Sequence, residues 1–122
     1  MEAFPLYVDL HMSIRKTKSK DNHVLRTVSD ENAFYFYKEI GSPIDVKAVN
    51  LEDFLQKLAL VDAVSIQFHA GRHDFENWIK MLGDATLAEQ IVALTRKNLP
   101  SSKLKREVIK LVKQRLAKLR AA

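Results

Sequence analysis

Ser65 to Leu87 reads SIQFHAGRHDFENWIKMLGDATL, and the rest of the chain is organised around this stretch. It holds the only tryptophan, two of the four histidines and two of the three glycines. Large apolar side chains recur through it at helical spacing, so we expect it to form part of the core, with Trp78 as the anchor.

Two helix-start signals lie inside the stretch. Asp74 precedes Phe75–Leu82, and Asp84 precedes Ala85–Asn98, each in the position of an N-terminal cap. Gly83 between them is suited to the left-handed conformation that ends a helix. Ser65, as a cap before Ile66, favours a further short helix, although the alternation of Val64, Ile66 and Phe68 also fits a strand.

The flanking segments complete a predicted α+β fold. Leu6–Ile14 alternates apolar and polar residues and predicts a strand, paired antiparallel with a second strand at His23–Val28. The further expected elements are a strand at Ala33–Ile40, an extended segment at Ile44–Val49, a helix at Leu51–Val61 capped by Asn50, and a last helix at Lys103–Arg120 capped by Ser101 or Ser102. We therefore predict short N-terminal antiparallel strands, then a helical module, then a basic C-terminal helix. Residues 1–100 form one compact domain and 101–122 the basic amphipathic helix.

Composition excludes several classes of site. The absence of cysteine rules out disulfides, thiolate-bound metal and thiol catalysis. The N-terminus lacks the basic and apolar regions of a signal peptide, and no apolar run approaches the roughly 18 residues of a membrane span. These features predict a cytoplasmic protein that does not enter membranes.

Positive charge is concentrated at the C-terminal end. Residues 103–122 carry eight cations and one acid, Glu107, which gives a net charge of +7. Because the whole chain carries +5, residues 1–102 carry −2. Such asymmetry is typical of an interaction segment for nucleic acid. A second basic run, RKTKSKDN at 15–22, predicts either a solvated hairpin loop or a second phosphate contact. The cations expected to contact nucleic acid are Lys103, Lys105, Arg106, Lys110, Lys113, Arg115, Lys118 and Arg120, with Arg15, Lys16, Lys18 and Lys20.

The four adjacent aromatic residues of Phe34–Tyr37 permit two interpretations. They suit a buried strand whose tyrosine hydroxyls reach the surface, or a platform on which bases stack. Core packing is favoured, because Lys38 is the only cation nearby.

Enzymatic chemistry finds little support in the central stretch. His69 and His73 have the spacing of a helical metal pair, but Gly71 lies between them and no third ligand is evident. No glycine-rich phosphate loop, nucleophile elbow or usable carboxylate pair is present. We predict a non-enzyme with no metal, no cofactor and no evident small-molecule substrate. His69 is expected at the core edge, hydrogen-bonded to a carboxylate or the backbone, and His73 in solvent.

Arg72 is the most ambiguous single residue. It suits a salt bridge with Asp74 or Glu76, or a contact with an anion such as phosphate. Arg72 and His73 are therefore added to the candidate nucleic-acid contacts.

The segments FYFYKEIG, NLEDFLQKL, SIQFH, GRHDFENWI and LGDATLA, between residues 34 and 88, resemble a small archaeal and bacterial family of domains of unknown function. The resemblance rests on the Phe68-His69 pair, on Arg72 with Asp74 and Phe75, on Trp78-Ile79, and on Gly83-Asp84 followed by Leu87-Ala88. It implies no reaction and no catalytic residue.

Together these features predict a non-enzymatic, RNA-associated protein, such as a peripheral component of a ribosome or other ribonucleoprotein. Two alternatives stay open. The apolar stripe of the last helix could grip a protein partner, as in a regulatory module, or the cations could coat DNA, as in a chromatin protein.

Overall fold

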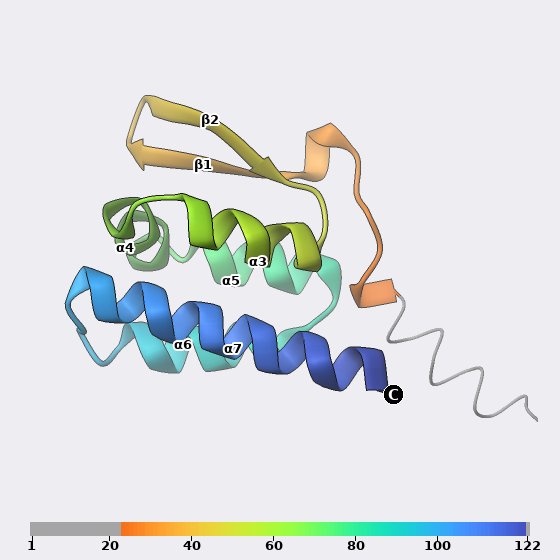
Figure 1. Cartoon of the computed structure of the whole chain (residues 1–122). Helices are drawn as coiled ribbons and strands as arrows, with labels where there is room; N and C mark the ends of the chain where they lie inside the picture. The colour runs from red at the N-terminus through yellow and green to blue at the C-terminus, as the bar shows by residue number, and fades with distance from the viewer. Residues whose placement is uncertain (1–22, 122) are drawn as a thin grey trace, which may run out of the picture.

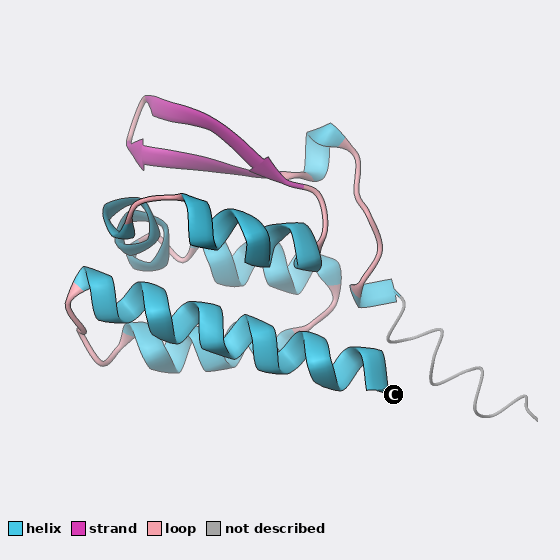
Figure 2. Ribbon diagram, viewed as in Figure 1, coloured by secondary structure: helices cyan, strands magenta, loops and turns pink. Residues whose placement is uncertain are grey.

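The computed structural model describes residues 23–121, which form a two-stranded antiparallel sheet stacked on a set of helices. In Figure 1 the sheet lies above a layer of α3, α4 and α5, with α6 and α7 beneath, and Figure 2 separates the strands from the helices by colour. This arrangement confirms the predicted α+β class. The elements are η1 (Asp30–Asn32), β1 (Phe34–Glu39), β2 (Ser42–Ala48), α3 (Leu51–Leu60), α4 (Ala63–Gly71), α5 (Asp74–Leu82), α6 (Ala85–Thr95) and α7 (Ser101–Ala121).

Strand β1 places its aromatic residues on alternating faces. Phe34 and Phe36 are buried against the helices, whereas Tyr35 is exposed and Tyr37 is half-buried. The preferred interpretation of core packing is therefore correct for the two phenylalanines.

Strand β2 is irregular. It pairs Ala48 with Phe34 and Pro43 with Tyr37, and the register shifts twice along the ladder. Asp45 lies within the strand at a positive φ of 57°, which L-residues rarely adopt. These irregularities match the features of a β-bulge, which twists a strand locally and interrupts its pairing.

Three local signals for helix ends are confirmed. The side chain of Asn50 accepts a hydrogen bond from the Asp53 amide, 2.7 Å, at the start of α3. Asp84 accepts from the Leu87 amide, 3.1 Å, at the start of α6. Gly83 ends α5 in the left-handed region with φ 108°. Each signal is correct because it depends on atoms only a few residues apart.

Three predicted caps are wrong. Helix α7 begins at Ser101, so Ser101 and Ser102 both lie inside the helix instead of capping it. Helix α4 starts at Ala63, so Ser65 lies inside it and donates its hydroxyl to the Tyr37 carbonyl instead, 2.7 Å. Asp74 is the first residue of α5 rather than its cap, and its carboxylate bonds to the side chains of His69 and Arg72. The Ser65 hydroxyl binds a partner 28 positions away, whereas the Asp74 carboxylate binds side chains five and two positions before it.

The predicted strand at His23–Val28 is also wrong, because this segment begins with a helical turn and continues as a loop. Val24 is buried in the core. The Arg26 guanidinium donates to the carbonyls of Leu82, 2.8 Å, and Met81, 3.2 Å, and so satisfies the last turn of α5. Its proposed partner strand, Leu6–Ile14, lies outside the described residues.

The last helix packs on the core over its whole length. It begins at Ser101, directly after Pro100, and contacts α3, α4 and α6. Its buried side chains are Leu104, Val108, Val112, Leu116 and Leu119. Burying one such side chain stabilises by about 1.5–3 kcal/mol, and a whole domain has a net stability of only about 5–15 kcal/mol. We therefore expect that the chain without α7 does not fold.

Candidate nucleic-acid interface

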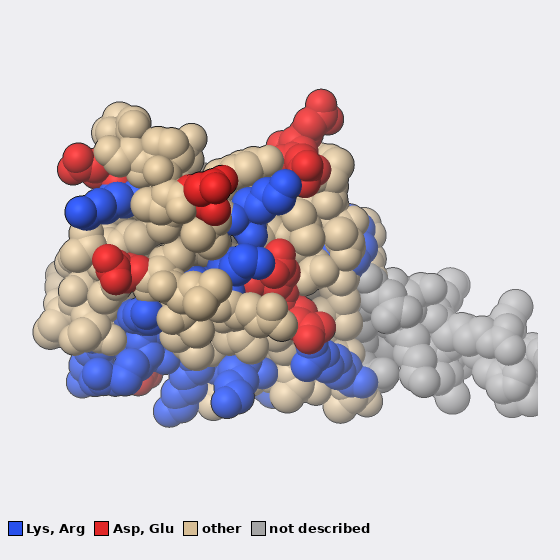
Figure 3. Space-filling model, turned by 45° about the horizontal axis from the view of Figure 1, so that its top comes forward, with Lys and Arg blue, Asp and Glu red and all other residues tan. Residues whose placement is uncertain are grey.

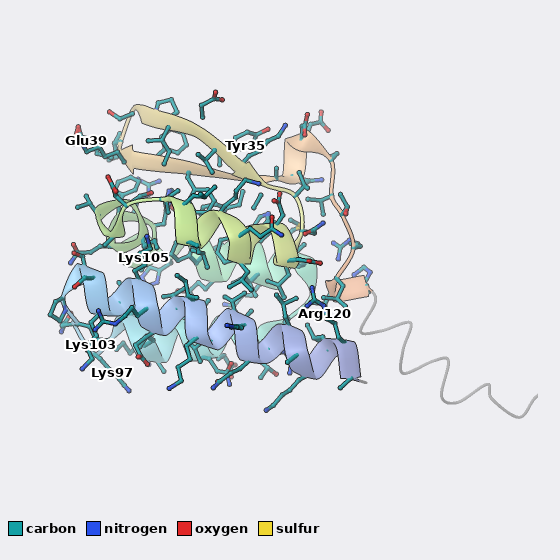
Figure 4. The ribbon with its side chains drawn as sticks, in the orientation of Figure 1. Tyr35, Glu39, Lys97, Lys103, Lys105 and Arg120 are labelled. Carbon is teal, nitrogen blue, oxygen red and sulfur yellow. The ribbon has the colours of Figure 1, made fainter. Side chains whose placement is uncertain are left out.

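Three of the eight C-terminal cations are held by contacts within the protein. The Lys105 ammonium donates to the carbonyls of Val61, 2.7 Å, and Ala59, 3.3 Å, at the end of α3. Arg115 pairs with Asp84 at 2.7 Å, and Arg120 pairs with Glu52 at 2.8 Å. Figure 4 labels Lys105 and Arg120 towards opposite ends of α7. These three cations join α7 to the rest of the fold.

The other five point into solvent and form the basic face of α7. They recur mostly three or four residues apart and, within residues 23–121, make no ion pair. From the first to the last they span 15 positions, which corresponds to about 22 Å at the rise of an α-helix. In Figure 3, blue side chains line the lower edge of the molecule, where Figure 1 places α6 and α7. The members are Lys103, Arg106, Lys110, Lys113 and Lys118.

Two cations at the end of α6 were missed in the sequence. Arg96 and Lys97 are exposed and precede α7 by only a few residues. Figure 4 places Lys97 and Lys103 at the same end of the molecule. They lie outside residues 103–122, over which the positive charge was counted, although the turn before α7 is short enough to bring them near its basic face.

The apolar stripe of α7 is fully used by the core, as described above. It therefore presents no continuous apolar surface to a bilayer or a partner. No helix within residues 23–121 has the length and apolar character that crossing a membrane requires.

His69 is the most constrained polar residue of the central stretch. Its side chain is 3% exposed, its Nε2 accepts from the Tyr37 amide at 2.8 Å, and its Nδ1 donates to Asp74 at 2.9 Å. Burial lowers the pKa of His69, and the hydrogen bond to Asp74 opposes this shift only in part. The ring is therefore neutral, with its proton on Nδ1. The predicted position of His69 at the core edge is confirmed.

Ser65 and His69 together bind both backbone groups of Tyr37. Tyr37 lies opposite Pro43 in the sheet, but its N–H and C=O groups both bond to α4, on the side away from β2. The hydroxyl of Ser65 supplies a donor to the Tyr37 carbonyl, while His69 accepts from the Tyr37 amide. The two polar side chains thus fix β1 to α4, and both are fully occupied in doing so.

Comparison with known proteins identifies a family for this chain. The model of a family of unknown function, DUF5752, matches residues 11–113, which is most of the chain. The chain belongs to the DUF5752 family. No curated protein and no solved structure matches it.

The DUF5752 match is wider than the resemblance between residues 34 and 88. It includes α7 as far as Lys113, and therefore Lys103, Arg106 and Lys110 as well. The basic helix is thus part of the matched DUF5752 domain for most of its length.

Arg72 and His73 lie at the corner between α4 and α5 of the DUF5752 domain. The Arg72 Nε donates to Asp74 at 3.2 Å, and its guanidinium lies 5.3 Å from the centre of the Phe68 ring. His73 is exposed and hydrogen-bonded to Glu76. Arg72 borders a hollow beside Tyr35 and Tyr37 of β1, and no cation of α7 borders that hollow.

The candidate metal pair and the candidate basic loop remain to be placed. In the described part of this DUF5752 protein, no three His, Asp or Glu side chains come together as a metal site, and His69 and His73 bind separate carboxylates. The basic loop residues Arg15, Lys16, Lys18 and Lys20 lie outside the described residues.

Proposed function

We propose that this chain is a non-enzymatic, RNA-associated protein of the cytoplasm, a peripheral component of a ribosome or other ribonucleoprotein. It binds the phosphate backbone through the basic face of α7. One observation supports the proposal. The apolar side of α7 is buried in the core, and the opposite side carries cations that form no ion pair within residues 23–121.

This arrangement suits phosphate binding physically. A helix fixed in the core holds its cations at constant spacing, so little backbone freedom is lost when a polyanion binds. Each neutralised phosphate releases counterions, which provides the driving force. Contacts of this kind position a protein on the backbone without reading sequence.

Burial of the apolar stripe favours this function over a module in which the stripe grips a protein partner. A partner that bound the stripe would have to displace Leu104, Val108 and Leu116 from the core. Coating of DNA uses the same phosphate chemistry, so the experiments must include both nucleic acids.

The first prediction concerns the salt dependence of RNA binding by the full chain. With five phosphates contacted, we expect a log–log slope of affinity against salt of about −4.5 on a duplex and about −3.5 on a single strand. Fluorescence anisotropy of a labelled RNA, titrated at several potassium chloride concentrations, measures this slope. The double variant Lys110→Gln/Lys113→Gln should reduce the magnitude of the duplex slope by about 2.

A charge-matched control is available in the sheet. Lys38→Gln/Lys47→Gln removes the same charge from exposed residues of β1 and β2, in the layer opposite α7. It should leave the slope nearly unchanged. Equal effects of the two double variants would show that only net charge matters and would contradict an interface on α7. Co-purification from native lysate, with and without ribonuclease or deoxyribonuclease, then separates RNA from DNA as the partner.

A further inference from the structure

A groove of about 420 Å³ opens beside β1, between the turn after that strand and the corner where α4 meets α5. Ligand pockets in proteins commonly have volumes of about 300–1,000 Å³ and combine aromatic walls with a few polar groups. This groove has both kinds of lining. Its principal side chains are Tyr35, Tyr37, Phe68, Arg72, Asp74 and Asn77.

The aromatic side of the groove is accessible. Tyr35 is 46% exposed, although it is a large ring on a strand whose neighbours Phe34 and Phe36 are buried. Its hydroxyl donates to the Asp30 carbonyl at 2.6 Å, which restrains the ring without covering it. Exposed rings of this kind offer π faces on which a planar heterocycle stacks.

The cationic side of the groove is held in place by two contacts. Asp74 receives hydrogen bonds from His69 and from the Nε of Arg72, and the guanidinium lies over the Phe68 ring. The two terminal nitrogens of Arg72 make no hydrogen bond to any residue of 23–121. A guanidinium restrained at Nε presents these nitrogens as a fork, which is the geometry that binds phosphate or carboxylate oxygens in pairs.

We propose that this groove binds one nucleotide. The base lies against the rings of Tyr35 and Tyr37, the phosphate binds the terminal nitrogens of Arg72, and the Asn77 amide offers one donor and one acceptor to the edge of the base. A free mononucleotide and an unpaired nucleotide of an RNA chain share this chemistry. The groove is built from β1, α4 and α5, so the inference goes beyond the proposed role of α7.

The test is a titration of the full chain, followed by ¹H–¹⁵N correlation spectra, with uridine monophosphate, uridine and ribose 5-phosphate as separate probes. The monophosphate should shift the amide signals of Tyr35, Tyr37, Arg72 and Asn77. Uridine and ribose 5-phosphate should each bind at least about tenfold more weakly, because each lacks one of the two recognised groups.

Variants then assign the contacts. Arg72→Gln should weaken binding of the monophosphate by about tenfold or more, and Tyr35→Leu should weaken it by removing the stacking surface. Lys80→Gln removes the same charge from an exposed residue of α5 outside the groove and should bind like the unaltered chain. The spectra also show whether each variant is folded.

A short single-stranded oligouridylate distinguishes the two sources. If it shifts the same four amides and depends on Arg72, the nucleotide belongs to RNA; if only the monophosphate does so, the ligand is a free nucleotide. The inference is overturned if the monophosphate leaves these amides unmoved, or if Arg72→Gln binds it as well as the unaltered chain does. Variants of the basic face of α7 should not change binding of the monophosphate, so failure of the RNA interface and failure of this groove are separate results.

Discussion

Replacing Arg115 by methionine is expected to lower the free energy of unfolding by about 3–5 kcal/mol, because it leaves a buried carboxylate without its cation. The carboxylate is that of Asp84, whose side chain is 1% exposed. Its Oδ1 accepts from the Leu87 amide at 3.1 Å and its Oδ2 accepts from the Arg115 Nε at 2.7 Å. One residue thus caps α6 and anchors α7, and removal of the arginine affects both helices.

Thermal unfolding followed by circular dichroism measures this effect. For a domain of this size we expect a fall in melting temperature on the order of 10–20 °C. The double variant Asp84→Asn/Arg115→Met should recover part of the loss, because asparagine still caps α6 and carries no charge.

Lys113→Met is the matched control for Arg115→Met. It makes the same change of charge on the exposed face of the same helix, and we expect a change in stability within about 0.5 kcal/mol. Similar melting temperatures for the two variants would contradict the structural role of Arg115. If Arg115→Met weakens RNA binding without lowering the melting temperature, Arg115 contacts the nucleic acid instead.

The second large effect is expected at His69. His69→Leu removes the acceptor of the Tyr37 amide and one donor to Asp74. A buried amide left without a partner costs about 1–3 kcal/mol, and leucine fills the space without replacing either bond. Urea unfolding at neutral pH measures the loss. A variant as stable as the unaltered chain would show that another group satisfies Tyr37.

His69 also makes stability dependent on pH. Burial lowers its pKa in the folded state below the 6.5 of the unfolded chain. Below pH 6.5 the unfolded chain therefore binds a proton that the folded chain does not, and the free energy of unfolding falls as the pH decreases towards the folded-state value. The slope contributed by one such group is at most about 1.4 kcal/mol per pH unit.

Urea unfolding between about pH 7.5 and 5 tests this dependence. The change in stability over this range should be smaller in His69→Leu than in the unaltered chain. His73→Gln is the control, because it replaces the neighbouring histidine, which is exposed rather than buried. The assignment fails if His69→Leu retains the full pH dependence.

The sequence predicts well those parts of the fold that depend on neighbouring residues. Asn50 and Asp84 each cap a helix by binding an amide three residues away, and Gly83 ends α5 through its own backbone conformation. The apolar spacing of α7 likewise predicts a single apolar face, but not that this face is buried in the core of the same chain, as it is.

The errors arise where a distant partner decides the structure. Arg26 binds the end of α5, more than 50 positions away, and no short-range pattern at His23–Val28 indicates it. Ser65 likewise binds the Tyr37 carbonyl, 28 positions away, instead of capping α4. Asp74 is the exception, because the side chains that bind its carboxylate, His69 and Arg72, are close in the sequence. In the candidate interface, the charge count identifies α7 as the most basic segment. It cannot separate Arg115 and Arg120, which pair with Asp84 and Glu52, from the cations that point into solvent.

The irregular edge of β2 has a consequence for the protein at high concentration. Among the described residues no strand covers this edge, and a regular row of exposed N–H and C=O groups would invite pairing with a second molecule. Pro43 lacks the N–H, Asp45 turns the backbone out of register, and Lys47 places a charged side chain, paired with Asp30 at 2.8 Å, on the strand. Resistance to self-association is therefore a sufficient physical reason for three residues that have no evident place in ligand binding.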